Sequence, residues 1–334
     1  MILTVTLNPA LDLTYRLPAV RLHAGNRVRD VRQQAGGKGI NVARVLAALG
    51  RTAIVTGLAG GPTGQALRAD LAAAALHDEL VEVAGETRRT VAVADDRDTT
   101  VFLEPGPPVT APEWRRFLAH YRRLLPGAAV AVLSGSLPPG LSADAYAVLI
   151  GLARAHGVPA VLDADGPALL RALPAGPAVV KPNAHELAAA TGTGDPVRGA
   201  ERLRAAGAAA VVASLGPDGL LAATAEGRWR ARPPEALPGN PIGAGDSAVA
   251  ALALGLADGT PWPERLRRAA ALSAATVLAP VAGQYDAGAY RRLLGEVRIE
   301  PLEPDGPQSD RPQRTAESRP TPPPRPTAQP RGEP

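Results

Sequence analysis

The sequence has no cysteine and few aromatic residues, and both shortages narrow what the chain can be. Without cysteine it can form no disulfide framework, no thiolate metal site and no cysteine nucleophile. Aromatic residues make up only 3% of the 334 positions, whereas 46% of the chain is hydrophobic. We therefore expect a globular protein whose core consists mainly of small aliphatic side chains on closely packed helices and strands.

Long apolar runs are also missing. No uncharged apolar stretch reaches the length of about 18 residues that marks a candidate membrane span. The opening segment MILTVTLNPALD has no basic residue and places Asn8, Pro9 and Asp12 too early for a signal peptide. These features predict no membrane-spanning segment and a cytoplasmic location.

The excess of positive charge is small. Lys and Arg number 36 against 32 Asp and Glu, which gives a net charge of +4 and an isoelectric point near 9.8. The arginines are scattered over the predicted helices, and few aromatic side chains are available to stack on bases. We expect no nucleic-acid partner. A few local cations that meet an anionic small molecule fit this composition better.

Short β-rich runs alternate with helical patterns along most of the chain, which predicts an α/β fold with a mostly parallel sheet covered on both faces. The predicted strands are 2–7, 52–58, 129–135, 158–165, 177–183 and 209–216. The predicted helices are 41–50, 63–76, 142–156, 184–190, 198–206, 247–257 and 263–279.

Two regions fall outside this alternation. Segments within about 11–32 and 86–105 alternate apolar and polar residues, which predicts an antiparallel patch outside the main sheet that could cover a pocket as a lid. Residues 300–334 are rich in Pro, Arg, Ser and Thr and have almost no large apolar residue. We expect them to form a disordered tail that follows one domain over residues 1–299.

The segment AGGKGINVARV, from Ala35 to Val45, invites comparison with phosphate-binding glycine loops. It is no Walker A motif, because Lys38 is followed by glycine rather than Ser or Thr, and no stretch of the chain satisfies GxGxxG. What remains is a glycine turn that leads into a helix, with Lys38 and Asn41 at the junction. The amides of such a turn favour an anion or a hydroxyl-rich sugar. A plain turn with a solvated lysine is the alternative.

The segment GAGD predicts a second anion-binding helix start, with an added carboxylate. The amides of Gly243, Ala244 and Gly245 at a helix start can stabilise a transferring phosphoryl group. Asp246 in that first turn could accept the proton of an attacking hydroxyl. Asp is also a common helix cap, so the local sequence leaves a proton acceptor and a plain cap open.

The segment KPNAHEL follows a predicted strand that ends at Lys181. Asn183 and Glu186 lie three residues apart on one helical face, and such oxygen ligands suit a hydrated magnesium ion. The same pair could equally form a capping box. The segment SLGPDG, with Ser214, Gly216 and Gly219, follows another strand; it could receive a nucleotide or serve only as a hairpin turn.

Taken in order, these segments resemble the ribokinase-like, phosphofructokinase-B (PfkB) family of sugar kinases. The resemblance covers about residues 1–297 and rests on TLNPALD, AGGKGINVARVLAALG, GETRRTVAV, VLSGSLPPG, VKPNAHEL, SLGPDG and NPIGAGDS. Within the family, LNPALD, NRV, GETR and PIGAGDS are most similar to the branch that holds 1-phosphofructokinase and tagatose-6-phosphate kinase.

The resemblance implies roles for particular residues. Asp246 would be the catalytic base, with Gly243, Ala244 and Gly245 as the anion hole. The residues implied to bind substrate are Asp12, Arg27, Gly37, Lys38, Asn41 and Arg88. The residues implied to bind the nucleotide are Lys181, Asn183, Ser214, Gly216 and Gly219, with Glu186 joining Asn183 at magnesium through water.

Alternatives stay open for several of these residues. Arg88 could instead form a surface ion pair with Glu86 or Asp98, and a surface ion pair is likewise the alternative for Arg27. Asp163 and Asp165 end a predicted strand and could shape a turn or support the site.

The resemblance implies a three-layer α/β/α fold with a small β lid, with ATP and Mg²⁺ as cofactors. It implies phosphorylation of a ketohexose phosphate, with fructose 1-phosphate to fructose 1,6-bisphosphate as the leading reaction. Tagatose 6-phosphate comes next, followed by fructose 6-phosphate or another hexose. A sensor of sugar phosphate or nucleotide without turnover is the alternative of a different class. A homodimer formed through the lid sheet is a further expectation.

Overall fold

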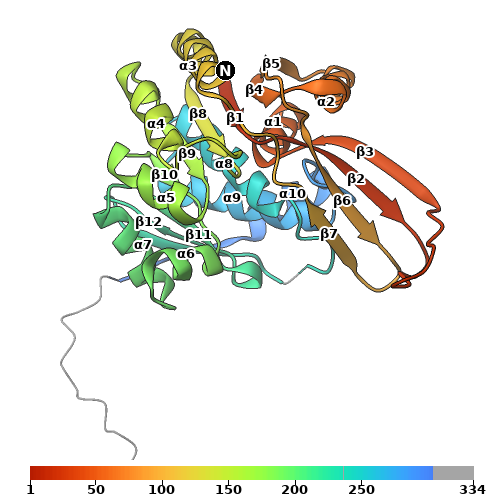
Figure 1. Ribbon diagram of the computed structural model, residues 1–334. Helices are drawn as coiled ribbons and strands as arrows, with labels where there is room; N and C mark the ends of the chain where they lie inside the picture. The colour runs from red at the N-terminus through yellow and green to blue at the C-terminus, as the bar shows by residue number, and fades with distance from the viewer. Residues whose placement is uncertain (236, 304–334) are drawn as a thin grey trace, which may run out of the picture. The chain divides into compact units, whose positions relative to one another are not determined.

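The computed structural model describes residues 1–235 and 237–303 (Figure 1). Most of the predicted tail therefore lies outside the described residues. The last described strand, β14 (Arg298–Pro301), pairs with β13 (Arg228–Arg232) and carries the fold two residues past the expected end at 299. Among the described helices, none is long and apolar enough to cross a membrane.

A large sheet forms the middle layer. In spatial order its strands are β14, β13, β12 (Leu220–Ala223), β11 (Val211–Ser214), β10 (Val179–Val180), β9 (Ala160–Asp163), β8 (Val130–Ser134), β1 (Ile2–Thr6), β4 (Ala53–Ala59) and β5 (His77–Glu82). The strands from β11 to β5 run parallel, whereas β12, β13 and β14 form an antiparallel extension. The prediction of a mostly parallel sheet is confirmed.

Helices cover both faces of this sheet (Figure 1). One face carries α1 (Lys38–Ala48), α2 (Gly61–Ala73), α8 (Ala244–Ala257), α9 (Trp262–Val277) and α10 (Ala287–Glu296). The other carries α3 (Ala111–Leu124), α4 (Ala145–Ala155), α5 (Gly166–Ala172), α6 (Ala184–Thr191) and α7 (Pro196–Ala205). Short 3₁₀ turns stand at η1 (Leu125–Gly127), η2 (Leu173–Ala175) and η3 (Gly216–Asp218).

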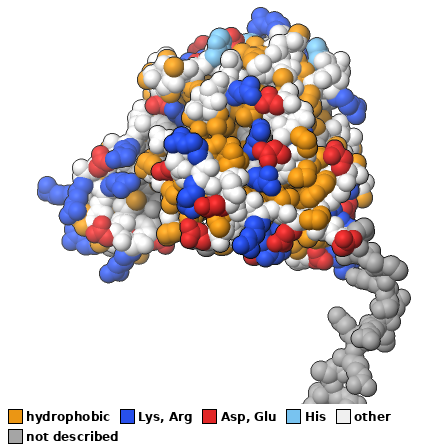
Figure 2. Space-filling view, turned by 180° about the vertical axis from the view of Figure 1, so that it is seen from behind, with side chains coloured by type: hydrophobic (Ala, Val, Ile, Leu, Met, Phe, Trp, Pro, Cys, Tyr) orange, Lys and Arg blue, Asp and Glu red, His pale blue; other side chains and the backbone are white. Residues whose placement is uncertain are grey.

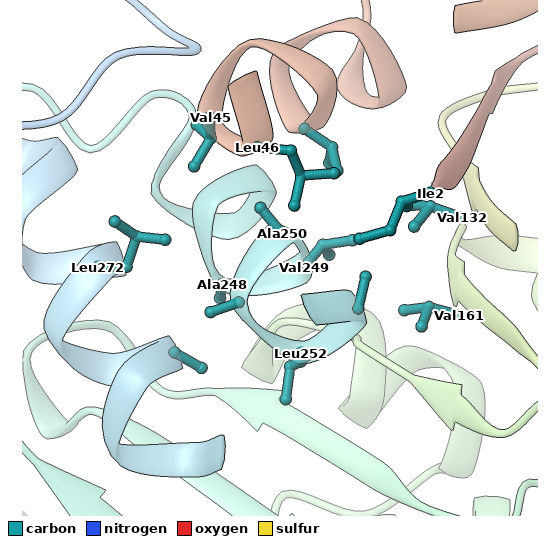
Figure 3. Close-up of a cluster of buried hydrophobic side chains, with 14 of the residues drawn as sticks. Ile2, Val45, Leu46, Val132, Val161, Ala248, Val249, Ala250, Leu252 and Leu272 are labelled. Atoms are coloured by element: carbon teal, nitrogen blue, oxygen red, sulfur yellow. The ribbon is translucent and has the colours of Figure 1, made fainter. Parts of the chain in front are cut away.

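The core is double because successive residues of a strand point to opposite faces. In β1, Ile2 packs toward α1 and α8, while Leu3 and Val5 pack on the opposite side. Figure 3 shows α8 in the first of these cores, with Ala248 and Ala250 beside Val249. Such small side chains let α8 pack closely between α1 and α9, as the composition predicted.

The lid is a separate sheet in the order β3-β2-β6-β7, made of β3 (Asp30–Gly36), β2 (Ala10–Arg16), β6 (Arg88–Ala94) and β7 (Thr99–Leu103). It extends from the main domain at the right of Figure 1. The expectation of a wholly antiparallel patch is wrong, because β2 and β6 pair in parallel. These strands belong to two different hairpins, so no short turn dictates that they run in opposite directions.

Arginine side chains gather on the outer part of the lid, at the left of the reversed view in Figure 2. The exposed arginines of its loops are Arg21, Arg27, Arg29 and Arg97.

Candidate active site

A cavity of about 1030 Å³ lies where the parallel strands of the main sheet reach their carboxyl ends. Residues that follow β1, β8, β9, β10 and β11 line it, together with the first residues of α1 and α8 and one face of the lid. In open α/β sheets this edge collects ligand-binding groups, because every parallel strand delivers its next loop to the same side. The fold therefore brings residues far apart in the sequence into one polar site.

Asp246 lies in the first turn of α8 and faces this cavity. The helix cap is Gly243, whose φ of 85° is the left-handed conformation that glycine adopts without strain, and no side chain caps the helix. Asp246 instead accepts a hydrogen bond of 2.8 Å from Asn41 Nδ2 at Oδ2. The plain-cap alternative for Asp246 is thus not what the structure shows.

The environment of Asp246 raises the pKa of its carboxyl group into the neutral range. The residue is 7% exposed, and this burial, together with the like charge of Asp163, raises the pKa of Asp246 to about 7. The hydrogen bond from Asn41 and the charges of Lys38 and Lys181 act in the opposite direction. A carboxylate with a pKa near the working pH is suited to accept and release a proton.

The start of α8, where Asp246 lies, also carries backbone donors. Within the described residues, the N–H groups of Gly243, Gly245 and Asp246 make no hydrogen bond, whereas Ala244 N–H donates to the Pro241 carbonyl at 3.2 Å. Ala244 also does not line the cavity, so this residue of the predicted anion hole is not placed for the role. The helix start still offers unpaired amides to an anion.

Two lysines meet on one buried carboxylate. Lys38 Nζ lies 3.1 Å from Asp163 Oδ1, and Lys181 Nζ lies 3.7 Å from the same oxygen. Of the 36 Lys and Arg residues only these two are lysine, so both lysine ammonium groups of the chain lie at this site. Burial lowers the pKa of Lys38, but the carboxylates around it, Asp163 first, outweigh burial and raise that pKa above its ordinary value. Asp163 therefore supports the site rather than only shaping a turn.

Asp12 and Arg88 bring opposite charges into the cavity from neighbouring lid strands. Burial raises the pKa of Asp12 to about 6, although Thr90 and the Arg88 guanidinium favour its charged form. Arg88 Nε donates to the Asn8 carbonyl at 3.1 Å.

The ion pairs that the sequence left open for Arg88 do not form in the described part of the chain. Glu86 instead accepts the Thr63 amide at 2.8 Å, and so ties the start of β6 to α2. This contact helps to fix where Arg88 stands, at the first residue of β6.

The lid places its arginines differently from the expectation. Arg27 is exposed in the loop between β2 and β3 and does not line the cavity. Arg16 and Arg32, from the paired strands β2 and β3, line it instead. The local sequence did not predict that Arg16 and Arg32 would line the cavity in place of Arg27, because only the pairing of the strands decides which side chains share the inner face.

Most of the predicted nucleotide residues line the same cavity. Lys181, Asn183, Glu186 and Ser214 line it. Asn183 Oδ1 accepts the Glu186 amide and Glu186 Oε2 accepts the Asn183 amide, both at 2.8 Å, so the capping box is formed as well. The box engages only Oε2 of Glu186 and is compatible with a further ligand role for this residue.

Gly37 and Asn41 line the cavity, but Gly216 and Gly219 do not. These two glycines lie in the turn between β11 and β12, next to Ser214.

Asn8 and Ser136 are among the polar cavity-lining residues that had no predicted role. Asn8 Nδ2 donates to the Pro105 carbonyl at 3.0 Å and to Ser136 Oγ at 3.2 Å, and both Asn8 and Ser136 line the cavity. Their segments, TLNPALD and VLSGSLPPG, had been recognised as motifs, but no local pattern distinguished these side chains from turn residues. Their contact joins the loop after β1 to the loop after β8.

Comparison with known proteins gives consistent matches. Residues 5–285 match the sequence profile of the pfkB family carbohydrate kinases. Phosphofructokinase-2 from Escherichia coli, solved with fructose-6-phosphate, is 32% identical, with 88% of this chain and 98% of that chain covered and a TM-score of 0.81. A Thermotoga maritima protein described as a possible 1-phosphofructokinase is 29% identical over 90% and 99% of the two chains, with a TM-score of 0.82.

A more distant structure supports the fold alone. Arabidopsis thaliana ribokinase, solved with ribose and ATP, is 20% identical over 88% of this chain and 98% of that chain, with a TM-score of 0.70.

Proposed function

The chain belongs to the pfkB family of carbohydrate kinases, and on this premise we propose that it transfers the γ-phosphoryl group of ATP to a hydroxyl of a phosphorylated ketohexose. The observation that carries the proposal is the position of Asp246, a buried carboxylate with a pKa of about 7 beside unpaired helix amides. A protein that only sensed sugar phosphate or nucleotide would have no use for a proton acceptor at this position. The geometry therefore favours the enzyme over the sensor.

In the proposed reaction the sugar hydroxyl gives its proton to Asp246. The hydroxyl oxygen forms a bond to the γ-phosphorus, the bond from that phosphorus to the β,γ-bridging oxygen breaks, and ADP leaves. The amides of Gly243 and Gly245 would stabilise the charge on the transferring group, and Lys38 and Lys181 would add positive charge nearby. Asn41 would hold the carboxylate in place through its hydrogen bond.

Kinases of this family use ATP with a metal ion, and the donors present here fit magnesium. Glu186 and Asn183 offer oxygen ligands at the nucleotide end of the cavity, of the kind that Mg²⁺ prefers in proteins. They would hold its water ligands, while Lys181 and Ser214 would contact the nucleotide. When bound, the ion would neutralise phosphate charge.

At the sugar end, Asp12, Gly37, Lys38 and Asn41 would hold the hydroxyls, and Arg88 would bind the substrate phosphate. A planar guanidinium can bind a phosphate group in two places, which suits an anionic sugar better than a neutral one. Fructose 1-phosphate is the substrate we favour, from the motif resemblance to the 1-phosphofructokinase branch. Tagatose 6-phosphate and fructose 6-phosphate are the alternatives, and the E. coli relative was solved with the latter.

The test is ADP release with a panel of fructose 1-phosphate, tagatose 6-phosphate, fructose 6-phosphate and free hexoses. We expect the highest kcat/KM with fructose 1-phosphate, and a loss of orders of magnitude in kcat for Asp246→Asn with nucleotide binding kept. Failure to turn over any member of the panel would remove the proposal. Wild-type activity in Asp246→Asn would mean that another group accepts the proton.

We also propose that two copies associate through the lid. Val31 and Phe102 are 58% and 60% exposed on strands β3 and β7, next to the cavity-lining residues Arg32 and Val101. Alternation along a strand places them on the outer face of the lid. E. coli phosphofructokinase-2, 33% identical with a TM-score of 0.82, has been solved as a tetramer. Light scattering of Phe102→Lys should show a smaller species than the wild type; equal masses would exclude this contact.

A further inference from the structure

One carboxylate oxygen outside the site joins two elements that build the site. Asp70, in the last turn of α2, accepts the backbone amide of Ala35 at Oδ2, with a distance of 2.8 Å. The same oxygen accepts Nη2 of Arg44, which belongs to α1. Asp70 thus binds the end of lid strand β3 and the helix that carries Lys38 and Asn41.

Helix formation does not account for a carboxylate at this position. The C-terminal end of a helix carries partial negative charge, so an acidic side chain in the last turn of α2 is unfavourable for the helix by itself. The Arg44 guanidinium compensates that charge, and the side chains of Arg44 and Asp70 are only 15% and 29% exposed. A partly buried, charge-assisted contact of this kind holds its partners more firmly than a solvent-exposed ion pair does.

The end of β3 is where the lid meets the sugar end of the cavity. Gly36 pairs with Ala10, and Gln34 pairs with Asp12, across the β2–β3 register. Gly36 packs so closely on Asp12 that a Cβ at position 36 would overlap the carboxylate. The position of the Ala35 backbone therefore determines where the Asp12 carboxylate lies.

On the other side of the contact, Arg44 lies near Asn41, which holds the proposed base Asp246. Arg44 stands one helical turn after Asn41, whose amide donates to Asp246. Gly283, in the loop that lines the cavity, packs on both residues: a Cβ there would lie 2.9 Å from Arg44 Cδ and 3.3 Å from Asn41 Oδ1. The Arg44 side chain therefore packs on the same loop as Asn41, one of the residues proposed to hold the sugar.

We propose that Arg44 and Asp70 are positioning residues for the sugar substrate, acting by fixing the end of β3 and hence Asp12. The proposal rests on the proposed function, since it assumes that a sugar phosphate binds at Asp12. It requires that loss of the contact weakens sugar binding while the nucleotide end, built on β10, β11 and α6, is unaffected.

Asp70→Ala provides the test, and Asp78→Ala is a matched control. Asp78 also accepts hydrogen bonds from a guanidinium and a backbone amide: Arg68 Nη1, on α2 like Asp70, lies at 2.6 Å, and the Leu80 amide at 2.8 Å. Neither Asp78 nor Arg68 lines the cavity. We expect Asp70→Ala to raise the KM for the sugar phosphate about tenfold or more. The KM for ATP should change by less than about twofold, and Asp78→Ala should leave both values near wild type.

Amide hydrogen exchange provides a readout that is independent of turnover. The Ala35 amide should exchange about tenfold faster in Asp70→Ala than in the wild type or in Asp78→Ala. Asp70→Asn, which keeps an acceptor but loses the charge, should show smaller changes of the same sign, and it carries the test if Asp70→Ala does not fold.

Equal sugar KM values for the wild type and the Asp70 variants would overturn the positioning role. Equal rises in the KM for sugar and ATP would do so too. A wild type inert toward every sugar phosphate would instead remove the proposed function, and the exchange data would then judge the Asp70–Ala35 contact alone.

Discussion

Replacing Asn41 by leucine should move the pH profile of the reaction to higher pH. Asn41 Nδ2 donates to Asp246 Oδ2 at 2.8 Å, and both side chains are buried. A hydrogen bond to a charged group contributes about 1.5–3 kcal/mol, and about 1.4 kcal/mol corresponds to one pKa unit. Loss of this bond disfavours the carboxylate, so the pKa of Asp246 should rise from about 7 to about 8–9.

The assay is kcat/KM for the sugar phosphate between pH 5.5 and about 9.5 with ATP saturating. Because the ionised form of Asp246 accepts the proton, activity should increase with pH through about 7 in the wild type and through about 8–9 in Asn41→Leu. At pH 7 the activity of the variant should be about ten- to a hundredfold below its own plateau. The midpoint, not the plateau, is diagnostic, because Asn41 is also proposed to touch the sugar. An unchanged midpoint would refute the assignment of Asp246 as the titrating base.

Three further predictions concern the same site. Asp246→Asn should stabilise the fold, because the pKa of Asp246 is about 7 in the folded protein against an ordinary value of 3.8, so the wild type loses stability as pH rises between these values. The difference in free energy of unfolding between variant and wild type, measured by denaturant titration, should grow by about 2–3 kcal/mol from pH 5 to pH 8, and a pH-independent difference would contradict this cause. Arg88→Ala should lower kcat/KM for phosphorylated sugars about 100-fold but leave free hexoses nearly unaffected, and equal losses would remove its phosphate role. Asp163→Asn should lower the midpoint of the kcat/KM profile below that of the wild type, because it removes the like charge that raises the pKa of Asp246; a shift upward would contradict that cause.

The sequence predicted the elements whose burial is encoded locally. Strands β1, β8 and β9 are short apolar runs with polar ends, and their fully buried residues, such as Val5 and Leu133, explain why the pattern was readable. Helix α3 was not predicted, although Thr110 and Glu113 form a complete capping box at its start. Apolar patterns were thus sufficient for most strands of the main sheet, whereas the capping signal of α3 did not lead to its prediction.

Contacts between distant segments could not be predicted in this way. The approach of Lys38 to Asp163 joins residues 125 positions apart, and only the strand order makes them neighbours. Arg32 rather than Arg27 lines the cavity for the same reason, since the register of the lid strands decides which residues face inward. For Asn183 the two local interpretations were both compatible with the fold, because a capping box and a place on the cavity wall coexist.

The pair of lysines on Asp163 makes the site addressable by amine chemistry. Reductive methylation with ¹³C-formaldehyde would modify only Lys38, Lys181 and the N-terminal amine, since no other primary amine exists in the chain. Lys38, with a side chain 37% exposed, should react before Lys181, which is 4% exposed. A carbon NMR spectrum of the labelled protein would then contain two lysine resonances, both from ammonium groups beside Asp163 in the cavity, and ligand titrations could be followed there without assigning any other signal.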